Sequence, residues 1–215
     1  MPRLALMIDL ERCTGCKSCE AACKSEHALG PTERHNRVVW LGSKLEENSD
    51  NNQALDFLAL ACQHCERPAC VRACPVSPKA ISKNKETGVV TVNEDACVGC
   101  GECVTACPYG AMGFDPDGRH AVKCDLCSDR RAEGAATTAC AAVCPTKAIT
   151  FGPRDELLKT TEANNREMIK NDPFLLGPAT IYLDRITNKQ EKFDAADRNS
   201  PKVIDSFTNI SIDDT

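Results

Sequence analysis

The sequence has few aromatic residues and no long apolar runs. Its 215 residues include one Trp, two Tyr and six Phe. Once cysteine is left out of the 42% hydrophobic content, roughly a third of the chain is apolar, which is little for one large core. The longest apolar stretches, residues 4–8 and 57–62, are far shorter than the about 18 residues that a membrane span needs. We therefore expect a soluble chain whose fold depends on more than apolar packing.

An export signal and an excess of positive charge are also missing. The N-terminus, M-P-R-L-A-L-M-I-D-L, carries a single arginine and no long apolar segment, which argues against a signal peptide of its own. The net charge is −5, and acidic residues are spread along the chain. A nucleic-acid-binding protein would show a basic footprint, so DNA and RNA are excluded as partners.

Cysteine, in contrast, is abundant. The chain has 16 cysteines, and without a secretory signal this number favours metal binding over a disulfide scaffold. They fall into four groups with none left over. The first and third groups follow C-x2-C-x2-C-x3-C, the second C-x2-C-x4-C-x3-C, and the fourth C-x2-C-x12-C-x3-C. The groups are Cys13, Cys16, Cys19, Cys23; Cys62, Cys65, Cys70, Cys74; Cys97, Cys100, Cys103, Cys107; and Cys124, Cys127, Cys140, Cys144.

The spacing within the groups predicts iron–sulfur clusters. The third group continues into Pro108 and matches the bacterial ferredoxin run that binds a [4Fe-4S] cluster. In that run three thiolates surround one cluster and the fourth cysteine ligates a second cluster, so the groups must work in pairs. Gly15 and Gly99 lie inside the first C-x2-C loops, where a residue without a Cβ lets the backbone turn tightly.

Zinc is the main alternative to iron–sulfur chemistry. Pairs of C-x2-C motifs bind zinc, and sixteen cysteines could form four such sites. A third cysteine after only two more residues, with a fourth before proline, fits poorly with paired tetrahedral sites. Four complete cysteine groups without a Ser/His/Asp-like constellation also argue against nucleophilic catalysis, so no catalytic residue is predicted.

Three groups end in a repeated phrase. In residues 74–81, 107–112 and 144–149, a proline ends the predicted helix that carries the last cysteine, and a small apolar pair then begins a predicted strand. Short aliphatic runs that precede the first, third and fourth groups also predict strands, at residues 4–8, 89–92 and 121–122. The first group lacks the closing proline, so its partner must lie elsewhere. Only 22 residues separate the second group from the third, and these two groups predict a compact module.

We therefore expect an α+β fold of two nested bacterial two-[4Fe-4S] ferredoxin-like modules, one inserted in the other. A C-terminal extension follows, with a helix at residues 155–169, a strand at 179–183 and a polar tail at 184–215. The predicted boundaries are 1–29 for the first part of the outer module, 30–61 for a polar insertion with a solvated loop at 42–53, 62–112 for the inner module, 113–151 for the second part of the outer module and 152–215 for the extension, which is expected to dock a partner.

The pairing predicts four ligand sets, because each terminal cysteine crosses to the partner cluster. Binding of a cluster by each group alone is geometrically awkward, since the fourth cysteine lies a helical turn past the third and faces away. Set 1 is Cys13, Cys16, Cys19 and Cys144; set 2 is Cys62, Cys65, Cys70 and Cys107; set 3 is Cys97, Cys100, Cys103 and Cys74; and set 4 is Cys124, Cys127, Cys140 and Cys23.

Residues 1–151 resemble a known family, the four-cluster iron–sulfur subunits of the DMSO reductase superfamily of molybdenum or tungsten bis-pterin oxidoreductases. The phrases that carry the resemblance are M-I-D-L-E-R-C-T-G-C-K-S-C-E-A-A-C-K, C-Q-H-C-E-R-P-A-C-V-R-A-C-P, C-V-G-C-G-E-C-V-T-A-C-P-Y-G-A, K-C-D-L-C-S-D-R-R-A-E-G and A-C-A-A-V-C-P-T-K-A-I. Some relatives replace a third-group cysteine and bind [3Fe-4S] there; here all four are present, so four [4Fe-4S] clusters are expected.

The resemblance implies a non-catalytic electron-transfer subunit. Its partner would be a large molybdenum- or tungsten-pterin catalytic subunit, and electrons would pass to or from a quinone-reactive membrane subunit or a soluble acceptor. It would lie in the cytoplasm, or in the periplasm after export with a signal-bearing partner. Two alternatives stay open, a subunit of a formate dehydrogenase/hydrogenase assembly and a free-standing polyferredoxin. The first rests on the K-C-D-L-C-S and C-P-T-K-A-I phrases, which also resemble hydrogenase-linked polyferredoxins.

Basic residues and histidines are interleaved with the cysteines. Positive charges there could raise cluster potentials, but for each one taken singly a solvated surface position is the better expectation. Among the histidines, His64 is expected to be a packed neighbour and not a ligand, and His27, His35 and His120 show no partner pattern. The interleaved basic residues are Lys17, Lys24, Arg67, Arg72, Lys79 and Lys123.

Overall fold

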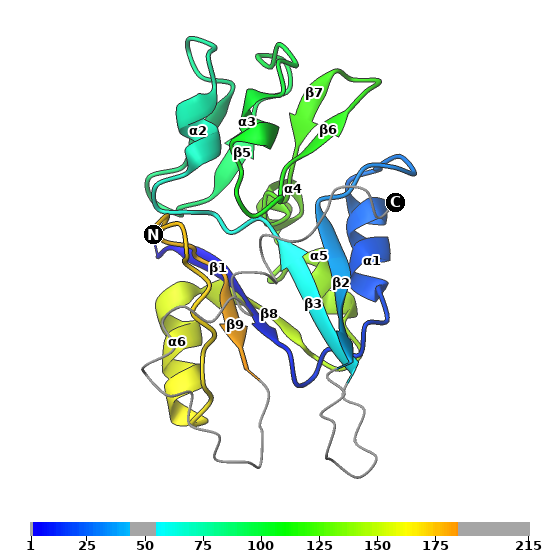
Figure 1. Ribbon diagram of the computed structural model, residues 1–215, viewed down its shortest axis with the longest axis vertical. Coiled ribbons are helices and arrows are strands. Elements are labelled where there is room, and N and C mark those ends of the chain that lie inside the picture. The colour runs from blue at the N-terminus through cyan, green and yellow to red at the C-terminus, as the bar shows by residue number, and fades with distance from the viewer. Residues whose placement is uncertain (1, 44–54, 185–215) are drawn as a thin grey trace.

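The computed structural model describes residues 2–43 and 55–184 (Figure 1). Its central sheet has three strands in the order β8–β1–β9. Strand β1 (Leu4–Asp9) pairs antiparallel with β8 (Ile149–Pro153) and parallel with β9 (Ile181–Leu183). Segments from the start, the late middle and the end of the described chain therefore form one sheet. The strand expected at residues 4–8 is confirmed, and the one expected at 179–183 begins two residues later.

Helix α6 (Arg154–Ala163) covers one face of this sheet. Its Leu157 packs with Ala5 of β1 and with Ile181 and Leu183 of β9. The helix ends earlier than the expected range of 155–169, because Asn165 adopts a left-handed conformation (φ 50°) that asparagine tolerates at helix ends. The described part of the C-terminal extension is thus packed against the chain's own first strand.

A long hairpin precedes the second cysteine group. Strands β2 (Asn36–Ser43) and β3 (Leu55–Ala61) pair antiparallel, and Leu58 and Leu60 are buried in the same core as Leu6 of β1. The sequence predicts only a polar insertion here, so these two strands were not expected. Of the loop expected at residues 42–53, the first two residues belong to β2 and the rest lies outside the described residues.

Short helices carry five of the sixteen cysteines and lie next to most of the others. Helix α1 (Ser18–Glu26) packs against α5 (Ala139–Val143), and α2 (Ala69–Ala73) packs against α3 (Glu102–Thr105). A further helix, α4 (Ser128–Ala132), follows the first pair of fourth-group cysteines. As predicted, α2 and α5 end just before the cysteine that precedes a proline, because proline cannot continue a helix.

Each repeated phrase leads into a strand, as the sequence predicts. The three phrases are followed by β4 (Ile81–Lys83), by β6 (Gly113–Asp115) and by β8. Strand β4 pairs with β5 (Val90–Val92), and β6 pairs with β7 (His120–Val122), so the strands expected at 89–92 and 121–122 are confirmed. In Figure 1 these hairpins lie with α2 and α3 at one end of the molecule, and the central sheet lies with α6 at the other.

The core consists of small aliphatic clusters mixed with cysteines. The largest cluster joins Leu6, Ile8 and the β3 leucines to Tyr182, which has no exposed surface, and to cysteines of three groups. A second cluster gathers Ile81 and Val90 around other cysteines. Within the described residues, no helix has the length and apolar character that a membrane crossing requires. The apolar content is therefore divided among several small cores around the cysteines.

An ion pair ties the end of β1 to the segment after α6. The Asp9 carboxylate is buried and accepts two hydrogen bonds from the Arg166 guanidinium, at 2.7 and 2.9 Å. Arg166 also donates to the backbone carbonyl of Asp184 at 2.6 Å. A second cation, Arg12, lies 3.6 Å from the same carboxylate, but its side chain is mostly exposed. The buried pair with Arg166 therefore carries most of the stabilisation of Asp9.

We predict that Arg166→Gln destabilises the protein by about 3 kcal/mol, because it leaves the buried Asp9 carboxylate without its main partner. This corresponds to a fall of roughly 6–12 °C in the temperature at which the helical circular dichroism signal is lost. The matched control Arg12→Gln removes an exposed partner of the same carboxylate and should cost less than about 1 kcal/mol. Equal effects of the two changes, measured at one heating rate, would contradict the assignment.

Candidate metal centres

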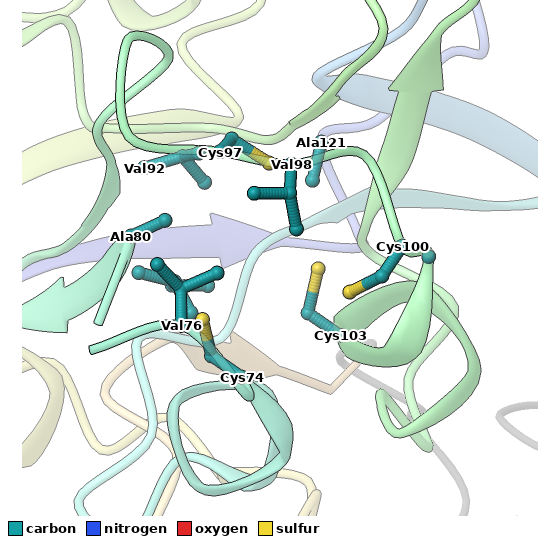
Figure 2. A pocket seen from close by; sticks show the side chains of 11 residues that line it. Cys74, Val76, Ala80, Val92, Cys97, Val98, Cys100, Cys103 and Ala121 are labelled. Carbon is teal, nitrogen blue, oxygen red and sulfur yellow. The ribbon is translucent and has the colours of Figure 1, made fainter. Parts of the chain in front are cut away.

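The cysteines of set 3 surround one hollow. Figure 2 shows the sulfurs of Cys74, Cys97, Cys100 and Cys103 around the same space. Cys74 follows α2, whereas the other three come from the loop before α3 and from α3 itself. Apolar side chains such as Val92 complete the wall, and the empty space is about 340 Å³ with its opening included. The fold thus brings a cysteine of the second group to three cysteines of the third.

The cysteines of set 2 line a second hollow of the same size. Cys62, Cys65 and Cys70 meet Cys107, and the empty space is again about 340 Å³ with its opening included. Burial, together with the other thiols of the hollow, raises the pKa of Cys65 and of Cys70 to about 12. Residues that complete the wall include Val90, Tyr109, Met112 and Leu176.

Sets 1 and 4 meet where α1 packs against α5. Burial raises the pKa of Cys23, and its next causes are the set 4 thiols Cys140 and Cys127. Burial likewise raises the pKa of Cys13, to which the set 1 thiol of Cys144 contributes. Cys19 faces both sets, because its pKa of about 12 reflects burial first, then Cys140 and, more weakly, Cys13. The structure therefore brings the first and fourth groups together across the sequence between them.

Crowded thiols of this kind suit a metal. All sixteen cysteines are free, and most are buried. Thiolates crowded in low-dielectric surroundings repel one another, so burial and neighbouring sulfurs raise the pKa of thiols such as Cys23 and Cys65 while no cation lies among them. Positive iron removes that penalty, and all-sulfur donors are the ligands that iron–sulfur clusters use. The donor chemistry of these sets fits bound iron–sulfur clusters.

Comparisons with known proteins agree with this chemistry. A family model for a 4Fe-4S dicluster domain matches residues 53–154, and a 4Fe-4S binding domain matches residues 4–25. The B subunit of the anaerobic dimethyl sulfoxide reductase of Escherichia coli K12 is 42% identical over 156 residues, which cover 71% of this chain and 74% of that protein. The chain belongs to the iron–sulfur electron-transfer subunits of the DMSO reductase superfamily. The family that its motifs resemble is thereby confirmed.

Two further relatives are also similar to this iron–sulfur subunit. The thiosulfate reductase electron transfer subunit PhsB of Salmonella typhi is 32% identical over 187 residues, or 87% of this chain and 95% of that protein. The B subunit of the polysulfide reductase of Wolinella succinogenes is 35% identical over 150 residues, or 70% of this chain and 76% of that protein. The match to PhsB is longer than the 151 residues on which the sequence motifs lie, so it includes residues outside that range.

The repeated phrases of the iron–sulfur subunit supply backbone donors to their own cysteine. The Ala148 N–H lies 3.2 Å from Cys144 Sγ. Burial acts to raise the pKa of Cys144, but the Thr146 hydroxyl and the backbone N–H groups of Ala148 and Ile149 lower it below its ordinary value. Backbone N–H groups after Cys74 lower its pKa in the same way against the effect of burial. Hydrogen bonds of this kind favour the thiolate, which is the form that binds metal.

Two cysteine loops depend on glycine, as the sequence predicts. Gly15 and Gly99 adopt left-handed conformations, with φ of 70° and 68°. A Cβ on Gly15 would lie 2.5 Å from the ring of Phe57, and one on Gly99 would collide with the Arg119 carbonyl oxygen of the turn between β6 and β7. The loops therefore turn tightly and also lie directly against neighbouring segments.

Of the interleaved basic residues, Lys123 departs from its expected surface position. Its side chain is only 4% exposed, and its ammonium donates to the backbone carbonyls of Val90 and Cys124. The expected surface position is wrong for Lys123 because it rests on how often lysine is exposed in general. The sequence does not indicate that the carbonyls of Val90 and Cys124 would both lie near this ammonium. Lys79, in comparison, is exposed and donates to the Cys74 carbonyl at 2.6 Å.

His64 is packed in the core, as the sequence predicts, and its Nδ1 is occupied by a hydrogen bond. It is 1% exposed, and its Nδ1 accepts a hydrogen bond from the Val90 N–H at 3.0 Å. Burial, followed by nearby Lys123, holds the pKa of His64 well below its ordinary value, so the ring is neutral. Because Nδ1 accepts a bond, the ring proton is on Nε2.

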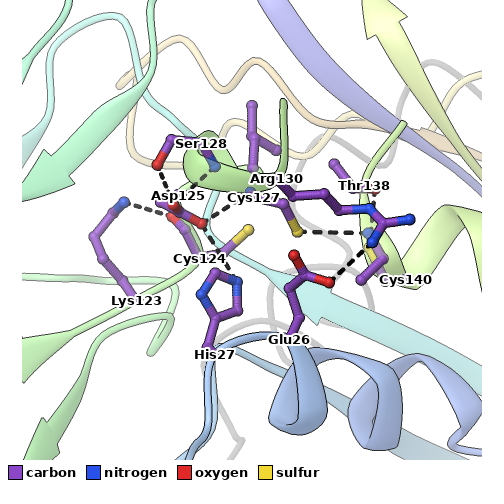
Figure 3. A network of polar contacts seen from close by, with 12 residues as sticks. Glu26, His27, Lys123, Cys124, Asp125, Cys127, Ser128, Arg130, Thr138 and Cys140 are labelled. Atoms are coloured by element: carbon purple, nitrogen blue, oxygen red, sulfur yellow. Dashed lines mark hydrogen bonds and ion pairs between the residues drawn. The ribbon is translucent and has the colours of Figure 1, made fainter. Parts of the chain in front are cut away.

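A histidine pair beside set 4 was not found by the sequence analysis. The rings of His27 and His35 lie 4.7 Å apart, and possible ligand atoms of Cys23 and these two histidines lie within 4.8 Å of one another. His27 Nε2 is 3.5 Å from the Asp125 carboxylate (Figure 3). Burial lowers the pKa of His35 to about 4. The two histidines lie on the segment between α1 and β2. They are eight residues apart in the chain and come together only because this segment folds back.

We predict that Gly99→Ala lowers the iron content of the purified subunit, because the new Cβ forces the cysteine loop away from Arg119. The loss should approach one cluster, or about a quarter of the iron. Gly101→Ala is the matched control, since Gly101 has a similar φ of 74° but no other segment of the described chain within 4 Å of the place that a methyl group would take. It should retain its iron and lose only about 1 kcal/mol of stability. Equal iron contents in the two variants would contradict the prediction.

Proposed function

We propose that this subunit relays electrons through four [4Fe-4S] clusters between a molybdenum- or tungsten-pterin catalytic subunit and a quinone-reactive membrane subunit or soluble acceptor. The observation that carries the proposal is the gathering of sixteen free cysteines into crowded sets with no cysteine left over. The relatives support it, because they are named as subunits of dimethyl sulfoxide, thiosulfate and polysulfide reductases.

We assign the clusters to sets 1 to 4. The two hollows support sets 2 and 3, and the packing of α1 against α5 supports sets 1 and 4. Helix α1 contributes a ligand to two sets, because it carries Cys19 of set 1 and Cys23 of set 4. Room between the four sulfurs of a hollow suits a cube better than one zinc ion, whose four thiolates close tightly around it. Each bound cluster would accept and return one electron.

We further propose that the sets form a line in the order 1, 4, 2, 3, within two nested ferredoxin-like modules. Sets 1 and 4 share the helix pair α1–α5, and sets 2 and 3 share α2–α3. Cys124 of set 4 and Cys62 of set 2 lie close enough for the second thiol to raise the pKa of the first, after burial, Cys140 and Cys23. This proximity joins the two pairs into one proposed path.

Exposure of the ligands supports the same order. Cys16 of set 1 and Cys100 of set 3 are exposed, whereas all four cysteines of set 4 are buried. In set 2, Cys62, Cys65 and Cys70 are also buried. A relay needs its end clusters near the surface, where partners can approach, and its middle clusters inside. Sets 1 and 3 are therefore the proposed ends of the line.

The first experiment is purification of the native complex without air. We expect about sixteen irons per chain, a broad EPR signal of interacting reduced clusters, and a large companion that contains molybdenum or tungsten. Zinc near four per chain with no iron would overturn the proposal. Sixteen irons without a companion would overturn the assignment to a fixed complex and favour a free carrier.

The same purification tests the docking role of the C-terminal tail. Because the described part of the extension packs on its own chain, we assign partner docking to residues 186–215, which lie outside the described residues. A chain truncated after residue 185 should keep its iron and lose the companion. Retention of the companion by the truncated chain would contradict this docking role.

The ligand sets are tested by pairs of cysteine variants. We expect Cys107→Ser and Cys65→Ser to alter the same component of the EPR spectrum, because both belong to set 2. Cys74→Ser and Cys100→Ser should alter a different component, that of set 3. If each cysteine group bound its own cluster, Cys107→Ser would instead match Cys100→Ser, and the crossed assignment would be wrong.

A further inference from the structure

A buried ammonium lies between sets 2 and 4. Lys123 donates to the carbonyl of Val90, whose residue lines the hollow of set 2, and at 2.5 Å to the carbonyl of Cys124, which belongs to set 4. Figure 3 shows the Lys123 side chain folded back beside Cys124. The side chain is 4% exposed, so water does not screen this charge effectively. The ammonium is thus fixed where the two proposed modules meet.

No carboxylate of the described chain balances this charge. Within residues 2–43 and 55–184, no Asp or Glu oxygen lies within 4.0 Å of the Lys123 ammonium. The neighbouring Asp125 side chain is used by Ser128 and by the Cys127 N–H. A buried charge without a partner is costly, so a lysine at this position calls for negative charge from another source.

The Lys123 charge is close enough to cysteines of both sets to affect their pKa values. Lys123 lowers the pKa of Cys70 of set 2 and of Cys124 of set 4, against the dominant effect of burial. A [4Fe-4S] cluster with four thiolates is an anion, with a charge of about −2 when oxidised and about −3 when reduced. The two clusters on either side can therefore supply the missing counter-charge.

The His64 ring, which also binds Val90, carries no positive charge. Its Nδ1 accepts the N–H of Val90, the residue whose carbonyl binds Lys123, so this nitrogen holds no proton and the ring is neutral. Arg3 and Arg131 also act on His64, but both are partly exposed. The fixed, buried positive charge at this junction therefore comes from Lys123.

We propose that Lys123 is the internal counter-charge at the junction of sets 2 and 4, and that it raises the reduction potentials of both clusters bound there. This inference rests on the proposed function. A positive charge stabilises the more negative, reduced cluster, so it makes both middle positions easier to reduce. Lys123 acts through the clusters' surroundings and is not a ligand.

The test is an EPR-monitored redox titration of the whole complex with Lys123→Gln, which keeps hydrogen-bond donors for the two carbonyls but removes the charge. We expect the reduced-to-oxidised ratio of two clusters, at a fixed potential, to fall about tenfold, equivalent to about 59 mV for a one-electron couple. The other two clusters should stay at their wild-type potentials. Lys123→Arg, which keeps the charge, should restore values near wild type.

Lys79→Gln is the matched control, because Lys79 donates to a cysteine carbonyl beside set 3 but is exposed. It should shift set 3 alone, and by less than Lys123→Gln shifts the middle clusters. Equal shifts in Lys123→Gln and Lys123→Arg, or no shift in either, would overturn the proposal. Loss of iron in Lys123→Gln but not in Lys123→Arg would support the need for a positive charge at this position. Loss of iron in both variants would overturn the proposal.

Iron content separates this inference from the proposed function. A wild-type complex without sixteen irons would overturn the four-cluster relay before any lysine is changed. A wild-type complex with its full iron content, but with potentials that do not depend on the charge at residue 123, would leave the relay standing and would overturn only the role of Lys123.

Discussion

Crowding of thiols in buried space is the constraint on which the rest of this structure depends. Burial and neighbouring sulfurs raise the pKa of Cys19, Cys65 and Cys70 to about 12, so without a cation these three thiols stay protonated. Cluster binding turns the same crowding into strong ligation. Because the aliphatic cores are small and separate, much of the stability of the fold must come from this ligation, as in other small metal-dependent domains.

The local chemistry of the sequence is arranged to favour ligation. The repeated phrases end a helix at a proline and then turn backbone N–H groups toward the preceding sulfur, as Ala148 does for Cys144. Cys23 is not followed by such a phrase and lies within α1, where burial and neighbouring thiols raise its pKa. A long-range contact, the packing of α1 on α5, positions this cysteine instead.

Local features were predictable because they follow from spacing and residue type. The strands next to the cysteine groups, the helix ends at proline and the turns at Gly15 and Gly99 all depend on a few neighbouring residues. The β2–β3 hairpin was missed because the apolar run before Cys62 is short and its partner strand is polar in part. The burial of Lys123 was missed for a different reason, since its acceptor Val90 lies 33 residues away in the chain. Contacts between segments that are distant in the chain cannot be predicted from local composition.

The C-terminal segment explains how the middle of the proposed relay is held in place. The Ala179 N–H donates to the Gln63 carbonyl at 2.7 Å, and Thr180 Oγ1 donates to the Cys62 carbonyl at 3.3 Å. Tyr182 belongs to β9 in the central sheet, and its hydroxyl accepts from the Gln63 side chain at 3.1 Å. The loop that carries Cys62 and Cys65 of set 2 is therefore bound to the central sheet, whose strand β1 leads into the first cysteine group. Because electron transfer weakens steeply with distance, a relay needs its ligand loops held in place. The bonds to the central sheet hold the loop of set 2, and the bonds of Lys123 join Val90 in the wall of the set 2 hollow to Cys124 of set 4.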